Sequence, residues 1–111
     1  MDHDYSEDIK KYTSIVDADA IRGIVKHLGI ALRNKDSSLV AASDPEELGR
    51  VRDSFLKKKL GLTHADAELD AAVKGVTDRM KSDHSKSRVT VYYLLAEQFN
   101  MLDKFKANAA K

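Results

Sequence analysis

The chain has 111 residues, of which 33% are charged, and its formal net charge at pH 7 is +1. This length predicts a single domain over residues 1–111 that buries a core without covalent staples. The absence of cysteine excludes disulfide bonds and thiolate zinc sites. No apolar run approaches the ~20 residues that span a membrane, and the acidic start at residues 1–8 differs from a secretory signal. We therefore expect a cytoplasmic protein with no membrane association.

Helical periodicity predicts an all-α fold, a small bundle of four main helices preceded by a short N-terminal helix. The short helix spans residues 5–12 and depends on docking, because so few residues are marginally helical alone. The first main helix spans residues 17–29. Asp17 is a good N-cap residue, and Gly29 can adopt the left-handed conformation that ends a helix. The sequence leaves open whether residues 30–32 continue as a turn or as a new helix.

The second main helix spans residues 44–60. Before it, residues 39–42 form a small apolar patch, either a helical turn or a short extended segment. Asp44 suits the N-cap, Pro45 the first helical position and Glu47 the third position of a capping box. The expected buried stripe consists of Leu48, Val51, Phe55, Leu56 and Leu60.

The third main helix spans residues 63–82, with Thr63 at its start. Gly75 lies inside this helix and costs about 1 kcal/mol relative to alanine, so we expect a close helix contact at that position. The expected buried stripe consists of Leu69, Ala72, Val73, Val76 and Met80.

The fourth main helix spans residues 87–102 and contains the most apolar run of the chain, residues 89–99. A strand is the alternative, since Val, Thr and Tyr favour strands. The apolar positions nevertheless recur at helical spacing for longer than an ordinary strand, and Ser87 suits the N-cap. Because its first two turns are apolar all round, we place this C-terminal helix at the centre of the bundle. We expect fraying at residues 1–4 and 106–111.

Charge is distributed unevenly along the chain. Residues 1–20 hold six carboxylates and two lysines, a balance of −4, whereas residues 50–60 hold five basic residues and one aspartate, a balance of +4. These segments could attract each other within one molecule, between two copies or towards an outside partner.

Sequence motifs for catalysis are missing. No two of the four histidines have the i, i+4 spacing of a helical metal site. His27 is better explained as a partly charged group at the negative end of a helix dipole. There is no Gly-x-Ser-x-Gly elbow and no phosphate-binding glycine loop. We therefore predict no catalytic residue, no cofactor site and no metal site. The histidines are His3, His27, His64 and His84.

Two basic segments are the candidate contacts for a phosphate or an acidic partner. The first is Lys57, Lys58 and Lys59, and the second comprises Arg79, Lys81, Lys86 and Arg88. If the segments met in space, they would form a patch that attracts phosphates. The helix–turn–helix order of residues 44–80 is compatible with DNA binding, but the acidic residues of the expected third helix would repel a DNA backbone.

Four segments resemble a family of short bacterial proteins, the domain of unknown function DUF 2853. They are residues 24–32 (IVKHLGIAL), 43–48 (SDPEEL), 55–62 (FLKKKLGL) and 86–96 (KSRVTVYYLLA). The resemblance covers nearly the whole chain. It implies a small bacterial, cytosolic helical protein and brings no catalytic residues with it.

Three hypotheses of function follow. The first is a non-enzymatic protein-interaction module that binds another protein or a second copy of itself. The second is a nucleic-acid-binding protein that uses the basic segments 57–59 and 79–88. The third is a small-ligand binder with a pocket between helices, near Tyr92 and Tyr93.

Overall fold

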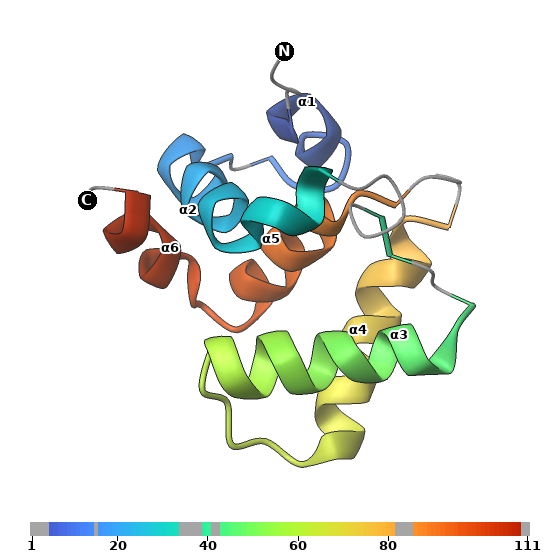
Figure 1. Ribbon diagram of the computed structural model, residues 1–111. Coiled ribbons are helices and arrows are strands. Elements are labelled where there is room, and N and C mark those ends of the chain that lie inside the picture. The colour runs from blue at the N-terminus through green and yellow to red at the C-terminus, as the bar shows by residue number, and fades with distance from the viewer. Residues whose placement is uncertain (1–4, 15, 34–38, 41–42, 82–85, 110–111) are drawn as a thin grey trace.

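The structure is a computed structural model that describes residues 5–14, 16–33, 39–40, 43–81 and 86–109. Figure 1 shows a bundle of short helices, which confirms the predicted all-α fold. Within the described residues, no helix is long and apolar enough to cross a membrane. In chain order the helices are α1 (Tyr5–Ile9), α2 (Ala18–Leu28), the 3₁₀-helix η1 (Gly29–Arg33), α3 (Pro45–Arg50), the π-helix η2 (Val51–Lys59), α4 (Asp66–Arg79), α5 (Arg88–Gln98) and α6 (Leu102–Ala109).

Helix α5 forms the centre of the fold, as the sequence predicts. All eight residues from Val89 to Ala96 are buried, and α1, α2, α4 and α6 all contact this helix. The backbone N–H of Asp17, at the start of α2, donates to the Tyr93 hydroxyl at 2.9 Å. The apolar run is therefore helical, and the alternative of a strand is wrong.

The chain beyond α5 differs from our expectation. We predicted one helix over residues 87–102 followed by a frayed tail, but α5 ends at Gln98 and a separate helix, α6, follows. Asn100 adopts a left-handed φ of 62°, a conformation that asparagine tolerates better than most residues. The chain turns there and α6 lies along α2 (Figure 1). Residues 1–4, 110 and 111, where we also expected fraying, lie outside the described residues.

The packing of α6 on α2 depends on Gly23. The carbonyl oxygen of Phe105 lies so near that a Cβ atom at Gly23 would be 1.9 Å from it. The side chain of Phe105 is fully buried and stacks against Phe55 of η2, with 5.8 Å between ring centroids. The close helix contact that we expected at Gly75 is absent from the described residues, since an added Cβ there would meet none of their atoms within 4 Å.

Two of the predicted N-caps are confirmed. The carboxylate of Asp17 accepts hydrogen bonds from the backbone N–H groups of Asp19 and Ala20, at 3.0 and 3.2 Å. The carboxylate of Asp44 accepts one from Glu46 at 3.0 Å. Gly29 and Gly61 both have positive φ angles, of 44° and 69°. Gly29 begins the 3₁₀-helix η1, which resolves the question about residues 30–32.

The other predicted helix starts need correction. Helix α4 begins at Asp66, so Thr63 is not its cap. Ser87 occupies the N-cap position of α5, but its hydroxyl makes no capping hydrogen bond. Glu47 does not complete a capping box, because its carboxylate binds two arginines. The apolar patch at 39–42 includes an isolated bridge between Leu39 and Ser87, so its described part is extended.

The predicted helix over residues 44–60 is continuous, but its hydrogen bonding changes from α to π at Val51. The buried residues Val51, Phe55 and Leu60 are spaced by four and then five positions. A π-helix, with its i to i+5 hydrogen bonds, aligns such a spacing along one face better than an α-helix does. The last of these bonds joins the Leu60 N–H to the Phe55 carbonyl at 2.9 Å.

Candidate functional site

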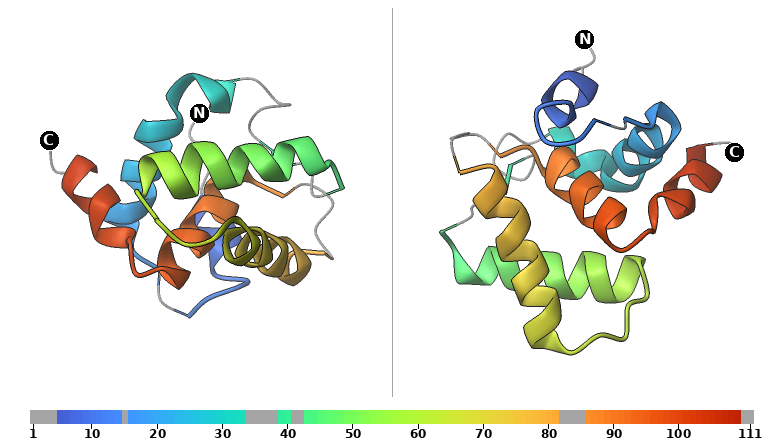
Figure 2. Two further views of the ribbon diagram at one scale, coloured as in Figure 1. Left: turned by 90° about the horizontal axis from the view of Figure 1, so that it is seen from below. Right: turned by 180° about the vertical axis from the view of Figure 1, so that it is seen from behind.

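A cleft of about 370 Å³ opens where α3 and α4 cross. Figure 2 shows this crossing from two further sides. Thr77 is buried and its hydroxyl donates to the carbonyl of Lys74 at 3.0 Å. Leu48 and Pro45 provide apolar surface. The lining residues are Ser43, Pro45, Leu48, Lys74, Thr77, Asp78, Lys81 and Lys86.

The cleft carries an excess of positive charge. Among the described residues, three lysines and one aspartate line it, and one of these lysines, Lys86, already has a partner within the chain. Lys74 and Lys81 are two helical turns apart on α4 and just beyond its end, about 10 Å along the axis. Both are exposed. No carboxylate among the described residues forms an ion pair with either of them, and Asp78 has no described cationic partner.

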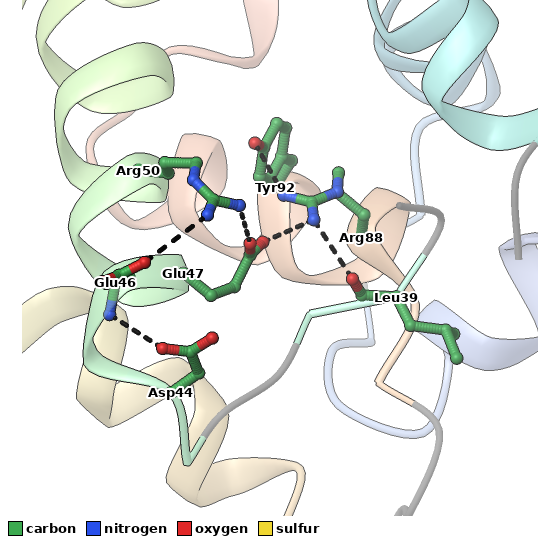
Figure 3. A network of polar contacts seen from close by, with 7 residues as sticks. All are labelled: Leu39, Asp44, Glu46, Glu47, Arg50, Arg88 and Tyr92. Carbon is green, nitrogen blue, oxygen red and sulfur yellow. Dashed lines mark hydrogen bonds and ion pairs between the residues drawn. The ribbon is translucent and has the colours of Figure 1, made fainter. Parts of the chain in front are cut away.

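A buried network next to the cleft joins α3 to α5 (Figure 3). The carboxylate of Glu47 pairs with Arg88, and the exposed fractions of the two side chains are 8% and 11%. Arg88 also donates to the Leu39 carbonyl at 3.1 Å and to the Tyr92 hydroxyl at 3.2 Å. Arg50 donates to the second oxygen of Glu47 at 3.0 Å. These bonds hold α3, and with it one wall of the cleft, against the central helix.

The network also perturbs the ionisation of Tyr92. Burial raises the pKa of its hydroxyl, and the guanidinium of Arg88 opposes that shift without cancelling it. Tyr92 stacks on Phe55 with 3.9 Å between ring centroids. Neither Tyr92 nor Tyr93 lines the cleft, so this pocket differs in place from the one that we expected near the two tyrosines.

The structure separates the residues of the second basic segment. Lys81 and Lys86 both line the cleft. Arg88 points into the buried network, and Arg79 donates to the backbone carbonyl of Tyr12. The cleft therefore keeps two of these four candidates, and it adds Lys74, which the sequence reasoning missed.

The first basic segment lies elsewhere. Lys57, Lys58 and Lys59 are at the far end of the helix that begins at Pro45, roughly 15 Å along its axis from Leu48 of the cleft. Lys57 pairs with Asp66 and lies 3.8 Å from a carboxylate oxygen of Asp53. Lys59 lies over the ring of Phe105, with its Nζ 5.6 Å from the centroid. The two basic segments thus do not merge into one patch.

The acidic and basic segments of the chain are also apart. Helix α1 and the π-helix η2 lie at opposite ends of the molecule in Figure 1 and in the right view of Figure 2. Lys10 and Lys11 pair locally with Glu7 and Asp8, at 3.6 and 3.4 Å. The opposite charges of residues 1–20 and 50–60 therefore do not hold α1 to η2.

The described histidines contact aromatic rings. His27 lies beside Phe55 and Phe105, with centroid distances of 6.4 and 6.2 Å. Burial, assisted by the nearby charge of Lys59, lowers the pKa of His27. The imidazole thus favours its neutral form, contrary to our expectation of a partly charged group. Within the described residues, no group of three or more His, Asp or Glu side chains could hold a metal ion.

The chain belongs to the family described as "Protein of unknown function (DUF2853)", whose model matches residues 4–103. This match confirms the family resemblance seen in the sequence. No curated protein matches the chain.

Proposed function

We propose that this protein is a non-enzymatic interaction module that receives an acidic segment of a partner protein in the cleft between α3 and α4. The observation that supports this proposal is the pair of exposed lysines, Lys74 and Lys81, that line one wall of the cleft. Neither Lys74 nor Lys81 forms an ion pair with a carboxylate among the described residues. An acidic segment would supply the missing counter-charges.

The shape of the cleft suits a peptide segment. Leu48 is half-buried and Pro45 is exposed, so a partner can bury apolar surface while its carboxylates meet the lysines. Each exposed ion pair contributes only about 0–1 kcal/mol. Binding is therefore expected to be weak, fast and sensitive to salt, because complementary surface charge mainly accelerates association.

The chemistry of the lining favours binding over catalysis. The described lining residues offer hydroxyls, ammonium groups and one exposed carboxylate, and they include no adjacent nucleophile and base. Nucleic-acid binding is a weaker alternative, because a basic footprint for a duplex normally covers one face. Here the two basic segments are split, and Arg79 and Arg88 contact other parts of the chain. The absence of cysteine supports a reducing, cytoplasmic setting, and the family resemblance supports a bacterial source.

Fluorescence anisotropy tests the proposal with a labelled octaglutamate peptide at low salt, against octaglutamine. The Lys74→Glu/Lys81→Glu variant should weaken octaglutamate binding at least tenfold. The matched control is Lys26→Glu/Lys58→Glu, which makes the same change in net charge at exposed positions outside the cleft. The control should stay within twofold of the parent protein.

Equal losses in both variants would show that only net charge matters, and would contradict a specific cleft. A labelled single-stranded oligonucleotide is the arm for the alternative function. If it bound more tightly than octaglutamate and depended on Lys57, Lys58 and Lys59, nucleic-acid binding would replace our proposal.

A further inference from the structure

Three charged side chains alternate in sign along the wall of the cleft that α4 forms. Lys74, Asp78 and Lys81 all line the cleft, and all three are exposed. Asp78 lies four residues after Lys74 and three residues before Lys81, which are the spacings of neighbouring side chains on one face of a helix. The N–H of Lys81 bonds to the carbonyl of Asp78 at 3.2 Å, so the turn after α4 keeps this path. We call these three residues the α4 charge row.

The members of the α4 charge row do not neutralise one another. No ion pair joins Asp78 to either lysine, and no other described residue forms an ion pair with any of the three. Similar spacings elsewhere do form such pairs, as between Lys10 and Glu7, three residues apart, at 3.6 Å. The row therefore presents three charges in the order plus, minus, plus, for which the described chain supplies no partner.

The spacing of the α4 charge row matches a second helix. At a rise of 1.5 Å per residue, the three charges lie at about 0, 6 and 10.5 Å along the axis of α4. A partner helix with charged residues three or four positions apart repeats these intervals on one face. An extended segment places the side chains of one face about 6.7 Å apart, so its third charge would fall about 3 Å too far along.

The volume of the cleft limits how such a helix could bind. The cleft measures about 370 Å³, whereas eight residues of helix, about 12 Å long and 10 Å across, occupy about 900 Å³. A partner helix would therefore lie along α4 over the mouth of the cleft and insert single side chains between its walls. Half-buried Leu48 and exposed Pro45, on the α3 wall, offer apolar surface to such a side chain.

We infer that the partner segment bound at this cleft is a helix with an acidic, a basic and an acidic residue on one face, at intervals of three or four positions. The acidic residues pair with Lys74 and Lys81, and the basic residue pairs with Asp78. Asp78 thus selects among acidic segments, because it repels a segment that has a carboxylate at the middle position. This inference rests on the proposed interaction function and names the chemistry of the partner.

Two labelled peptides of one composition test the inference. Both are alanine- and glutamine-based helices of 18 residues, matched for helicity by circular dichroism, with a leucine directly after the middle charged position. One carries Glu, Lys and Glu at positions 6, 9 and 13, and the other carries Glu, Glu and Lys there. Anisotropy at low salt should show the first binding at least fivefold more tightly, because one exposed ion pair changes affinity by up to about fivefold and the second order sets like charges against two members of the row.

A charge reversal at Asp78 tests the middle contact. In Asp78→Lys, the ratio of the affinities for the Glu-Lys-Glu peptide and for a Glu-Glu-Glu peptide should fall at least fivefold. Asp78 is exposed in the last turn of α4, where a cation suits the negative end of the helix dipole, so this variant should keep its fold. Glu68→Lys is the matched control, because it makes the same change in net charge at an exposed position of α4 outside the cleft. There the ratio should stay within a factor of 1.5.

A proline in place of the alanine at position 11 tests the helical form of the segment. Proline breaks a helix, so it should weaken binding of the Glu-Lys-Glu peptide at least fivefold. Binding that survives the proline would overturn the inference of a helix.

The outcomes separate the inference from the proposed function. Equal affinity for the two charge orders, while octaglutamate still binds, would overturn the inference and leave the acidic-segment proposal standing. No binding of any peptide, octaglutamate included, would overturn both. A dimer in size-exclusion chromatography with light scattering that Asp78→Lys dissociates would assign the α4 charge row to a second copy of this chain and overturn the inference of an outside partner.

Discussion

Replacing Gly23 with alanine should destabilise the protein, although alanine is the better helix former. The added Cβ would lie 1.9, 2.5 and 2.8 Å from three backbone atoms of Phe105. Backbone atoms cannot rotate away, so α6 has to move off α2. This movement opens the site in which the Phe105 side chain is fully buried.

Two opposing contributions set the size of the effect. Exposing a buried phenylalanine costs about 1.5–3 kcal/mol, whereas alanine gains about 1 kcal/mol over glycine within a helix. If α6 undocks, the net loss in the free energy of unfolding for Gly23→Ala is therefore about 0.5–2 kcal/mol. Urea denaturation followed by circular dichroism measures this difference, with the slope m as a check on compactness.

Gly75→Ala is the matched control, because Gly75 is helical and an added Cβ meets nothing within 4 Å. It should stabilise the protein by about 0.5–1 kcal/mol. The two substitutions thus have opposite predicted signs. A Gly23→Ala protein as stable as the parent, or more so, would refute the close packing of α6 on α2.

Three further predictions concern the core, the buried network and pH. Leu95→Ala should cost about 2–5 kcal/mol, because Leu95 is fully buried in α5; a loss below about 0.5 kcal/mol in a urea titration would contradict its central place. Glu47→Met should cost about 3–5 kcal/mol, because it leaves Arg88 charged and buried. Arg88→Met should lower the free energy of unfolding less than Glu47→Met does in the same titration, since Arg50 still pairs with Glu47. A larger loss for Arg88→Met than for Glu47→Met would contradict the network. Because burial lowers the pKa of His27 in the folded protein, stability should fall as the pH drops through the unfolded value near 6.5. In a His27→Gln variant, the free energy of unfolding should depend less steeply on pH between pH 7 and 5. An unchanged dependence on pH would contradict this role of His27.

The four main helices could be predicted because their signals are local. Apolar residues recur along one face, and Asp17 and Asp44 supply capping oxygens next to each helix start. The central position of α5 followed from its continuous apolar run. These features depend on neighbouring residues alone, so tertiary contacts reinforce them and do not override them.

The remaining elements depend on contacts between distant parts of the chain. Helix α6 has a weak pattern of its own and gains its stability from docking Phe105 near Gly23. Asn100 was a signal for the break before it, since asparagine is a common left-handed terminator. Glu47 suited a capping box locally, but Arg88, 41 residues away, binds its carboxylate.

The candidate cleft could be predicted only in part. Lys81 and Lys86 were identified because they flank a loop, whereas Lys74 looked like an ordinary exposed residue of α4. Its spacing of seven residues from Lys81 was a signal that both lie on one face of the helix. The crossing of α3 and α4, which creates the space between them, has no signature in either segment.

The most direct test of the account is a map of backbone amide shifts in the ¹⁵N spectrum of the full chain, titrated with the octaglutamate peptide. The account predicts that the largest changes fall at residues 43–48, 74–81 and 86. Changes concentrated instead at residues 57–61 and 104, around the far end of η2, would contradict it.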